Sequence, residues 1–111
     1  MGIKRYLSNY VVTTGCVKRL SIVEVDGGRL VSIKPFEEET AGTEYVPGVI
    51  VVADGAAAPS IEELINCIKE CEAETAECMA RLQGVCDYVV RERVMLYKID
   101  VIGHGVTAIM P

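Results

Sequence analysis

The sequence predicts an α+β domain: a bent mixed β sheet or pseudo-barrel of about six or seven strands, with one long amphipathic helix. Three observations predict this fold. Segments rich in Val, Ile and Tyr fill the first half of the chain, apolar residues then recur at spacings of three and four, and further apolar segments follow. Because half of the 111 residues are hydrophobic, we expect a single domain over residues 1–111 with one core.

The first half of the chain, residues 1–53, is expected to form strands. Gly15 marks a turn, and Asp26-Gly27-Gly28 marks a hairpin because glycine takes the positive φ angles that tight turns require. The acidic stretch 35–43 is expected to be a solvated loop, with the connector 53–59 later in the chain. The four predicted strands cover residues 6–13, 17–25, 29–34 and 45–52.

A single helix is predicted over residues 60–83, ended by Gly84. Ser60 and Glu63 have the spacing of a capping box, in which each side chain accepts from a free amide at the helix start. At 1.5 Å per residue the helix would be about 33 Å long. Its apolar stripe follows spacings of three and four, and its members are candidates for a protein interface: Ile61, Leu64, Ile68, Cys71, Thr75, Cys78 and Leu82.

The C-terminal part, residues 85–111, is expected to return to strands. Gly103-His104-Gly105 is typical of a hairpin loop between the last two of them. The three predicted strands cover residues 87–94, 95–102 and 106–110.

Three segments of the first 50 residues carry a resemblance to a known family. Residues 6–13 read Tyr-Leu-Ser-Asn-Tyr-Val-Val-Thr, residues 23–33 contain Asp26-Gly27-Gly28-Arg29-Leu30, and residues 42–50 contain Val46-Pro47-Gly48-Val49. In this order they resemble the N-terminal composite domain, a small β domain, of the amidohydrolase superfamily of metal-dependent hydrolases. The resemblance implies a stand-alone relative of that domain, with a buckled mixed sheet or pseudo-barrel.

The sequence departs from the family where its chemistry would begin. In those hydrolases the Pro-Gly strand leads to a His-x-His pair that binds a metal, and the metal activates water. Residues 51–54 are Val-Val-Ala-Asp instead, and a catalytic (β/α)₈ barrel needs at least about 200 residues. We therefore predict no hydrolase activity, no catalytic residue and no cofactor.

Charge and cysteine usage narrow the class of partners. The net charge of −5 with scattered Lys and Arg argues against nucleic acid, and the absence of 18 consecutive apolar residues argues against a membrane span. Lys4 and Arg5 place charges where the apolar region of a signal peptide should begin, so we expect no signal peptide. Five cysteines without a Cys-x-x-Cys pair are typical of reduced thiols, so we expect a cytoplasmic protein.

The cysteines of the predicted helix have two interpretations. Cys67 and Cys71, one turn apart, are weak candidates for a shared zinc ion if Cys16, Cys86 or His104 folds close to them. Cys78 would lie about 10 Å further along the helix and outside such a site. Alternatively, the thiols are small buried hydrophobes. No catalytic thiol is predicted, because Lys69 and Arg81 would lie on other faces.

Three further features are each read as structural. His104 between two glycines is a turn residue rather than a general base, because no nucleophile accompanies it. Glu37-Glu38-Glu39 is a solvated loop rather than a metal site, because three consecutive side chains do not converge on one ion. Asp54-Gly55 is a turn rather than a surviving metal ligand, because no second ligand is near it in sequence.

These observations predict a non-catalytic interaction or accessory module. It is expected to form a homo-oligomer, through the helix stripe or an edge strand, or to bind a protein partner such as a separate barrel subunit. The alternative is a small ligand- or metal-binding protein or enzyme that uses a pocket between helix and sheet with Cys67, Cys71 and His104.

Overall fold

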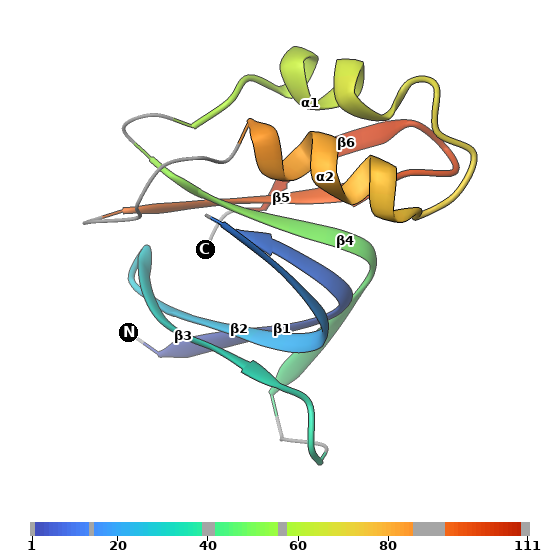
Figure 1. Cartoon of the computed structure of the whole chain (residues 1–111). Helices are drawn as coiled ribbons and strands as arrows, with labels where there is room; N and C mark the ends of the chain where they lie inside the picture. The colour runs from blue at the N-terminus through green and yellow to red at the C-terminus, as the bar shows by residue number, and fades with distance from the viewer. Residues whose placement is uncertain (1, 14, 39–41, 56–57, 86–92, 110–111) are drawn as a thin grey trace.

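The fold consists of six strands and two short helices (Figure 1). The computed structural model describes residues 2–13, 15–38, 42–55, 58–85 and 93–109. In chain order the elements are β1 Ile3–Thr13, β2 Cys16–Asp26, β3 Arg29–Pro35, β4 Thr43–Asp54, α1 Ile61–Ile68, α2 Ala76–Gly84, β5 Val94–Asp100 and β6 Gly105–Ile109.

All six strands belong to one mixed sheet in the order β3-β2-β1-β4-β5-β6. The pairing of β1 with β4 is parallel, and every other pairing is antiparallel. The β1–β2 and β2–β3 connections are short and turn at Gly15 and at Gly27-Gly28, whose positive φ angles suit glycine. The predicted α+β class and the bent mixed sheet are confirmed.

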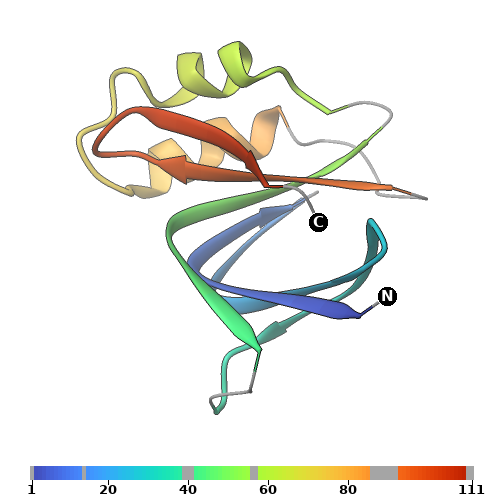
Figure 2. The same ribbon diagram turned by 180° about the vertical axis from the view of Figure 1, so that it is seen from behind.

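The sheet is strongly bent but does not close into a barrel. Of the two predicted alternatives, the chain therefore forms the bent sheet and not the pseudo-barrel. Its end strands are β3 and β6, and a hydrogen bond from the Val94 amide to the Gly28 carbonyl, at 2.8 Å, links β5 to the β2–β3 turn. Figure 2 shows the bend from behind, with both helices on one face. The concave face buries a core of its own that includes Tyr6, Val23 and Leu96.

The predicted single helix over residues 60–83 is wrong. The chain forms α1, leaves helical geometry after Lys69, and starts again at the N-cap Thr75, whose hydroxyl accepts from the Cys78 amide at 3.2 Å. Two antiparallel helices bury both halves of the apolar pattern on one small sheet, whereas a straight helix of about 33 Å would carry its second half past the sheet. The predicted cap at Ser60 is confirmed, since its side chain accepts from the Glu63 amide.

The Pro47-Gly48 step lies where the hydrogen-bond ladder of β4 is interrupted. Pairing with β1 jumps from Val46 to Val49, and pairing with β5 begins only at Val49. Proline has no amide to donate, so it is tolerated at this break in the middle of an inner strand. Gly48 takes a φ of +93° there.

The C-terminal strands agree in part with the prediction. β5 and β6 correspond to the predicted strands 95–102 and 106–110, with a turn that contains Gly103-His104. The predicted strand 87–94 lies outside the described residues except for its last two. Among the helices that the structure describes, none has the length and apolar character to cross a membrane.

Candidate functional site

The predicted interface stripe is divided between core and surface. Ile61 is 42% exposed, Thr75 is exposed as an N-cap, and Cys71 is half-buried in the loop between the helices. The other four members are fully buried in one core with side chains of β1, β4 and β5, and they are Leu64, Ile68, Cys78 and Leu82. Most of the apolar stripe therefore packs on the chain's own sheet, which leaves little of it for a partner.

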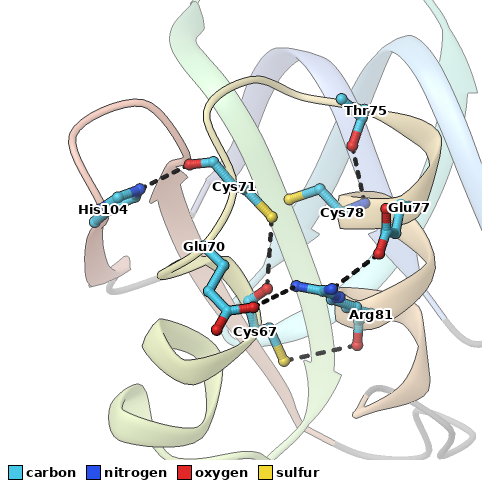
Figure 3. Close-up of polar contacts among 8 residues, drawn as sticks. All are labelled: Cys67, Glu70, Cys71, Thr75, Glu77, Cys78, Arg81 and His104. Atoms are coloured by element: carbon cyan, nitrogen blue, oxygen red, sulfur yellow. Dashed lines mark hydrogen bonds and ion pairs between the residues drawn. The ribbon is translucent and has the colours of Figure 1, made fainter.

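The turn between α1 and α2 forms a cleft of about 410 Å³ beside three thiols (Figure 3). Cys71 and Cys78 line the cleft together with Arg81. Its rim is acidic, with Glu70, Glu72 and Glu77. The cleft thus combines a pair of cysteines with a negatively charged entrance.

The Cys67 and Cys71 thiols donate hydrogen bonds to backbone carbonyls. The Cys67 thiol donates to the Arg81 carbonyl at 3.6 Å, which joins α1 to α2. The Cys71 thiol donates to the Cys67 carbonyl at 3.7 Å, and the Cys71 and Cys78 side chains lie next to each other at the cleft (Figure 3). Because the chain turns back after α1, Cys78 contacts Cys71, and the expected separation along one helix axis is wrong.

Burial keeps the thiols of Cys67 and Cys78 protonated at neutral pH. Burial raises the pKa of Cys78 to about 12, and the neighbouring Cys71 thiol adds to this shift. Burial also raises the pKa of Cys67, although the Arg81 guanidinium opposes it. Neither thiol is an activated nucleophile at neutral pH, because nucleophilic cysteines have a lowered pKa.

Arg81 lies at the cleft and not on a remote face of the helix. Its guanidinium is 2.9 Å from the Glu77 carboxylate and 4.0 Å from the Glu70 carboxylate. Both ion pairs are solvent-exposed, so each contributes little to stability. They do offset the positive charge of Arg81, which leaves the cleft acidic.

The structure supplies no metal centre for the candidate pair Cys67 and Cys71. Within the described ranges, no group of three or more His, Cys, Asp and Glu side chains is arranged to hold a metal ion. Cys86, one of the proposed additional ligands, lies outside those ranges. Glu37 and Glu38 are exposed, Glu39 is not described, and Asp54 is the last residue of β4.

The His104 side chain contacts the backbone of the loop between α1 and α2. It lies in the β5–β6 turn with a positive φ of 55°, and its Nε2 is 2.7 Å from the Cys71 carbonyl oxygen. The Nε2–H group donates this bond, which ties the α1–α2 loop to the β5–β6 turn. His104 is thus close to Cys71, but its described contact is with the main chain rather than the thiol.

The two end strands of the sheet differ in chemistry. β3 contains Arg29, Lys34 and Pro35, and Val31 is an extra residue at a bulge opposite β2. Charges, proline and bulges are the features that prevent an edge strand from pairing with another chain. β6 reads Gly-Val-Thr-Ala-Ile and has none of them.

The outer edge of β6 is open among the described residues. Its inner edge pairs with β5, and no further backbone hydrogen bond to Gly105–Ile109 occurs in the described part of the chain. Helix α1 lies near β6, and the Val106 and Ala108 side chains pack on the core beneath the helices. β6 therefore buries side chains while its outer amides and carbonyls need another partner or water.

No family model, curated protein or solved structure matches this chain. The resemblance of its first 50 residues to the composite domain of amidohydrolases therefore stays a prediction. Two features of the described residues bear on function: the thiol cleft and the outer edge of β6.

Two parts of this geometry were not predicted from the sequence. The proximity of Cys71, Cys78 and Arg81 depends on the break between the helices, and the sequence signal for that break is Thr75, a good N-cap three residues before Cys78. The contrast between the edge strands was readable from the residues of 29–35 and 105–109, but only the topology identifies these two as edges.

Proposed function

We propose that this chain is a non-catalytic interaction module that joins a second copy of itself through the outer edge of β6. One observation carries the proposal: the sheet ends in two edges, and β3 bears charges, a proline and a bulge while β6 bears none. An unprotected edge strand is a template for pairing with another strand. Cys78 is fully buried and the His104 side chain is hydrogen-bonded to the Cys71 carbonyl, so neither is arranged as an accessible nucleophile or general base.

A second copy is the partner that the residues of β6 fit best. In an antiparallel pair of two β6 strands with Thr107 on the two-fold axis, Thr107 lies opposite Thr107, and Val106 lies opposite Ala108. A symmetric pair places any central charge opposite itself, so an uncharged strand suits self-pairing. Threonine pairs across strands are favourable. The product is a continuous sheet of two six-stranded halves.

The charge of the whole chain opposes this association. Each copy carries a net charge of −5, so two copies repel each other at low ionic strength. The apolar Ile102, which is 74% exposed in the turn before β6, provides further surface to bury. We therefore expect a reversible dimer that added salt strengthens.

Thr107→Lys tests the pairing, because it places two ammonium groups opposite each other at the two-fold axis. The expected result is that sedimentation velocity gives a concentration-dependent dimer for the unmodified chain and only the 12.1 kDa monomer for the variant. Val31→Lys is the matched control, since it adds the same charge at the exposed bulge of β3 and should leave the dimer intact.

Two results would overturn the proposal. One is a monomer of the unmodified chain at every concentration and salt level. The other is a dimer that survives Thr107→Lys but dissociates with Val31→Lys, which would assign the interface to β3. Circular dichroism of both variants must show the unmodified fold, so that dissociation is not caused by unfolding.

A further inference from the structure

We propose that Cys71 and Cys78 form a reversible oxidation site, at which a low-molecular-weight disulfide converts the two thiols into an intrachain disulfide. The site lies in the cleft between α1 and α2, which both side chains line, and the two sulfur atoms lie next to each other (Figure 3). The inference is independent of the association of two copies through β6.

The backbone of both cysteines is held in place before any reaction. The Cys71 amide donates to the Ile68 carbonyl at 2.9 Å, and the Cys71 carbonyl accepts from His104. The Cys78 amide donates to the Thr75 hydroxyl at the start of α2. Two thiols held in contact at the ends of a short loop have a high effective concentration for one another.

Access to the cleft decides which thiol reacts first. Cys71 is half-buried and lines the cleft, whereas Cys78 is fully buried. A reagent from solution therefore reacts first with Cys71. Cys78 then reacts with the sulfur of Cys71 and not with the reagent directly. Cys67 is turned toward the Arg81 carbonyl, and it does not line this cleft in the described structure.

The reaction proceeds by two thiol–disulfide exchanges. The Cys71 thiolate attacks one sulfur of the small disulfide, the S–S bond breaks, and one small thiolate leaves. The Cys78 thiolate then attacks the Cys71 sulfur of the mixed disulfide and expels the second small thiolate. The chain loses two electrons and two protons, and the small disulfide becomes two thiols.

The acidic rim of the cleft selects among small disulfides. Glu70, Glu72 and Glu77 surround the entrance, and Arg81 is already paired with two of them. A cationic disulfide such as cystamine is attracted to this entrance, whereas oxidised glutathione, which bears several carboxylates, is repelled. We expect cystamine to close the bond faster than oxidised glutathione at equal concentration and low salt.

Tryptic digestion gives a direct test, because cleavage after Lys69 and Arg81 releases residues 70–81 with both cysteines and without Cys67. The reduced full chain is treated with cystamine, quenched in acid, alkylated, digested and measured by mass spectrometry. The expected peptide lacks two hydrogen masses and carries no alkyl group. Dithiothreitol should return both free thiols.

Variants separate the two exchange steps. Cys67→Ser should leave closure unchanged. Cys78→Ala should stop the reaction at the mixed disulfide on Cys71, and Cys71→Ser should prevent any modification of peptide 70–81 in the folded chain. In denaturant the five cysteines should give mixed pairings, because the folded geometry no longer selects one pair.

Three results would overturn the site. They are a mixed disulfide that persists on Cys71 of the unmodified chain, a disulfide between Cys67 and Cys71, and the same mixture of pairings in folded and denatured protein. The second exchange should accelerate as pH rises above neutrality, because the pKa of Cys78 is about 12. Closure should raise the melting temperature by roughly 10 °C, and no rise or a fall would show that the folded state does not accommodate the bond.

Discussion

Gly48 is the residue at which the backbone is least tolerant of a side chain. It combines a φ of +93° with a position against β5, where an added Cβ would overlap the Ile99 carbonyl oxygen. The Ser8 hydroxyl also donates to the Gly48 carbonyl, at 3.0 Å. We expect Gly48→Ala to lower the free energy of unfolding by about 3–5 kcal/mol, measured by urea denaturation.

Gly28→Ala is the matched control for this prediction. Gly28 has a similar φ of +85°, but the space that an added Cβ would occupy is open. Its substitution should therefore cost only the conformational penalty, about 1–2 kcal/mol. Equal effects at the two glycines would show that β5 does not approach Gly48.

Glu24 is the buried charge that links the first three strands. Its carboxylate lies 2.9 Å from the Arg5 guanidinium and 2.9 Å from the Lys34 ammonium, and it accepts from the Ser32 hydroxyl. The hydrogen bonds to Lys34 and Ser32 hold the pKa of Glu24 at about 2, below its ordinary 4.5. The folded chain therefore binds this proton less readily than the unfolded chain does.

This lowered pKa predicts the pH dependence of stability. The contribution of Glu24 is fully present above about pH 4.5 and is lost as the pH falls toward 2, because the folded state must then accept a proton on a carboxylate that it holds ionised. Urea titrations from pH 6 to pH 2 should show less acid sensitivity in Glu24→Gln than in the unmodified chain. Asp26→Asn, at the exposed end of β2, is the control. Unchanged acid sensitivity in Glu24→Gln would contradict this account of the ion cluster.

Among the elements, the break between α1 and α2 is tested by the sign of one substitution. Thr75 caps α2, so Thr75→Ala should destabilise the chain by about 1 kcal/mol in thermal or urea unfolding. In the interior of one long helix the same change would stabilise it, because alanine has the higher helix propensity. Thr75→Ser retains the hydroxyl and should be close to neutral. If Thr75→Ala stabilises the chain, the result would favour a single long helix and contradict the break.

At the level of elements, the sequence predicted strands better than helical continuity. Period and glycine positions located β1 to β4 because these signals are local. The helix break was not predicted, because Thr75 fits both a stripe of three-four spacing and an N-cap. Whether Thr75 continues one helix or caps a second one depends on the size of the sheet beneath it. Sheet size is a property of the tertiary fold.

Over the whole molecule, the same limit applies to the candidate sites. The cysteine cluster was visible as Cys67, Cys71 and Cys78, but their actual contacts, and the place of Arg81 among them, follow from the return of the chain after α1. The composition of each strand was equally visible, while the identity of the edges required the order β3-β2-β1-β4-β5-β6. The residue types of a site can be read from the sequence, whereas their contacts and their exposure depend on the tertiary fold.

The association of two copies through β6 is tested most directly by hydrogen exchange of the backbone amides at low and high protein concentration. Pairing predicts that amides of Gly105–Ile109 exchange more slowly at high concentration, since new interstrand hydrogen bonds protect them, while amides of Arg29–Pro35 are unaffected. Exchange in β6 that is independent of concentration, or slowing confined to β3, would contradict the account.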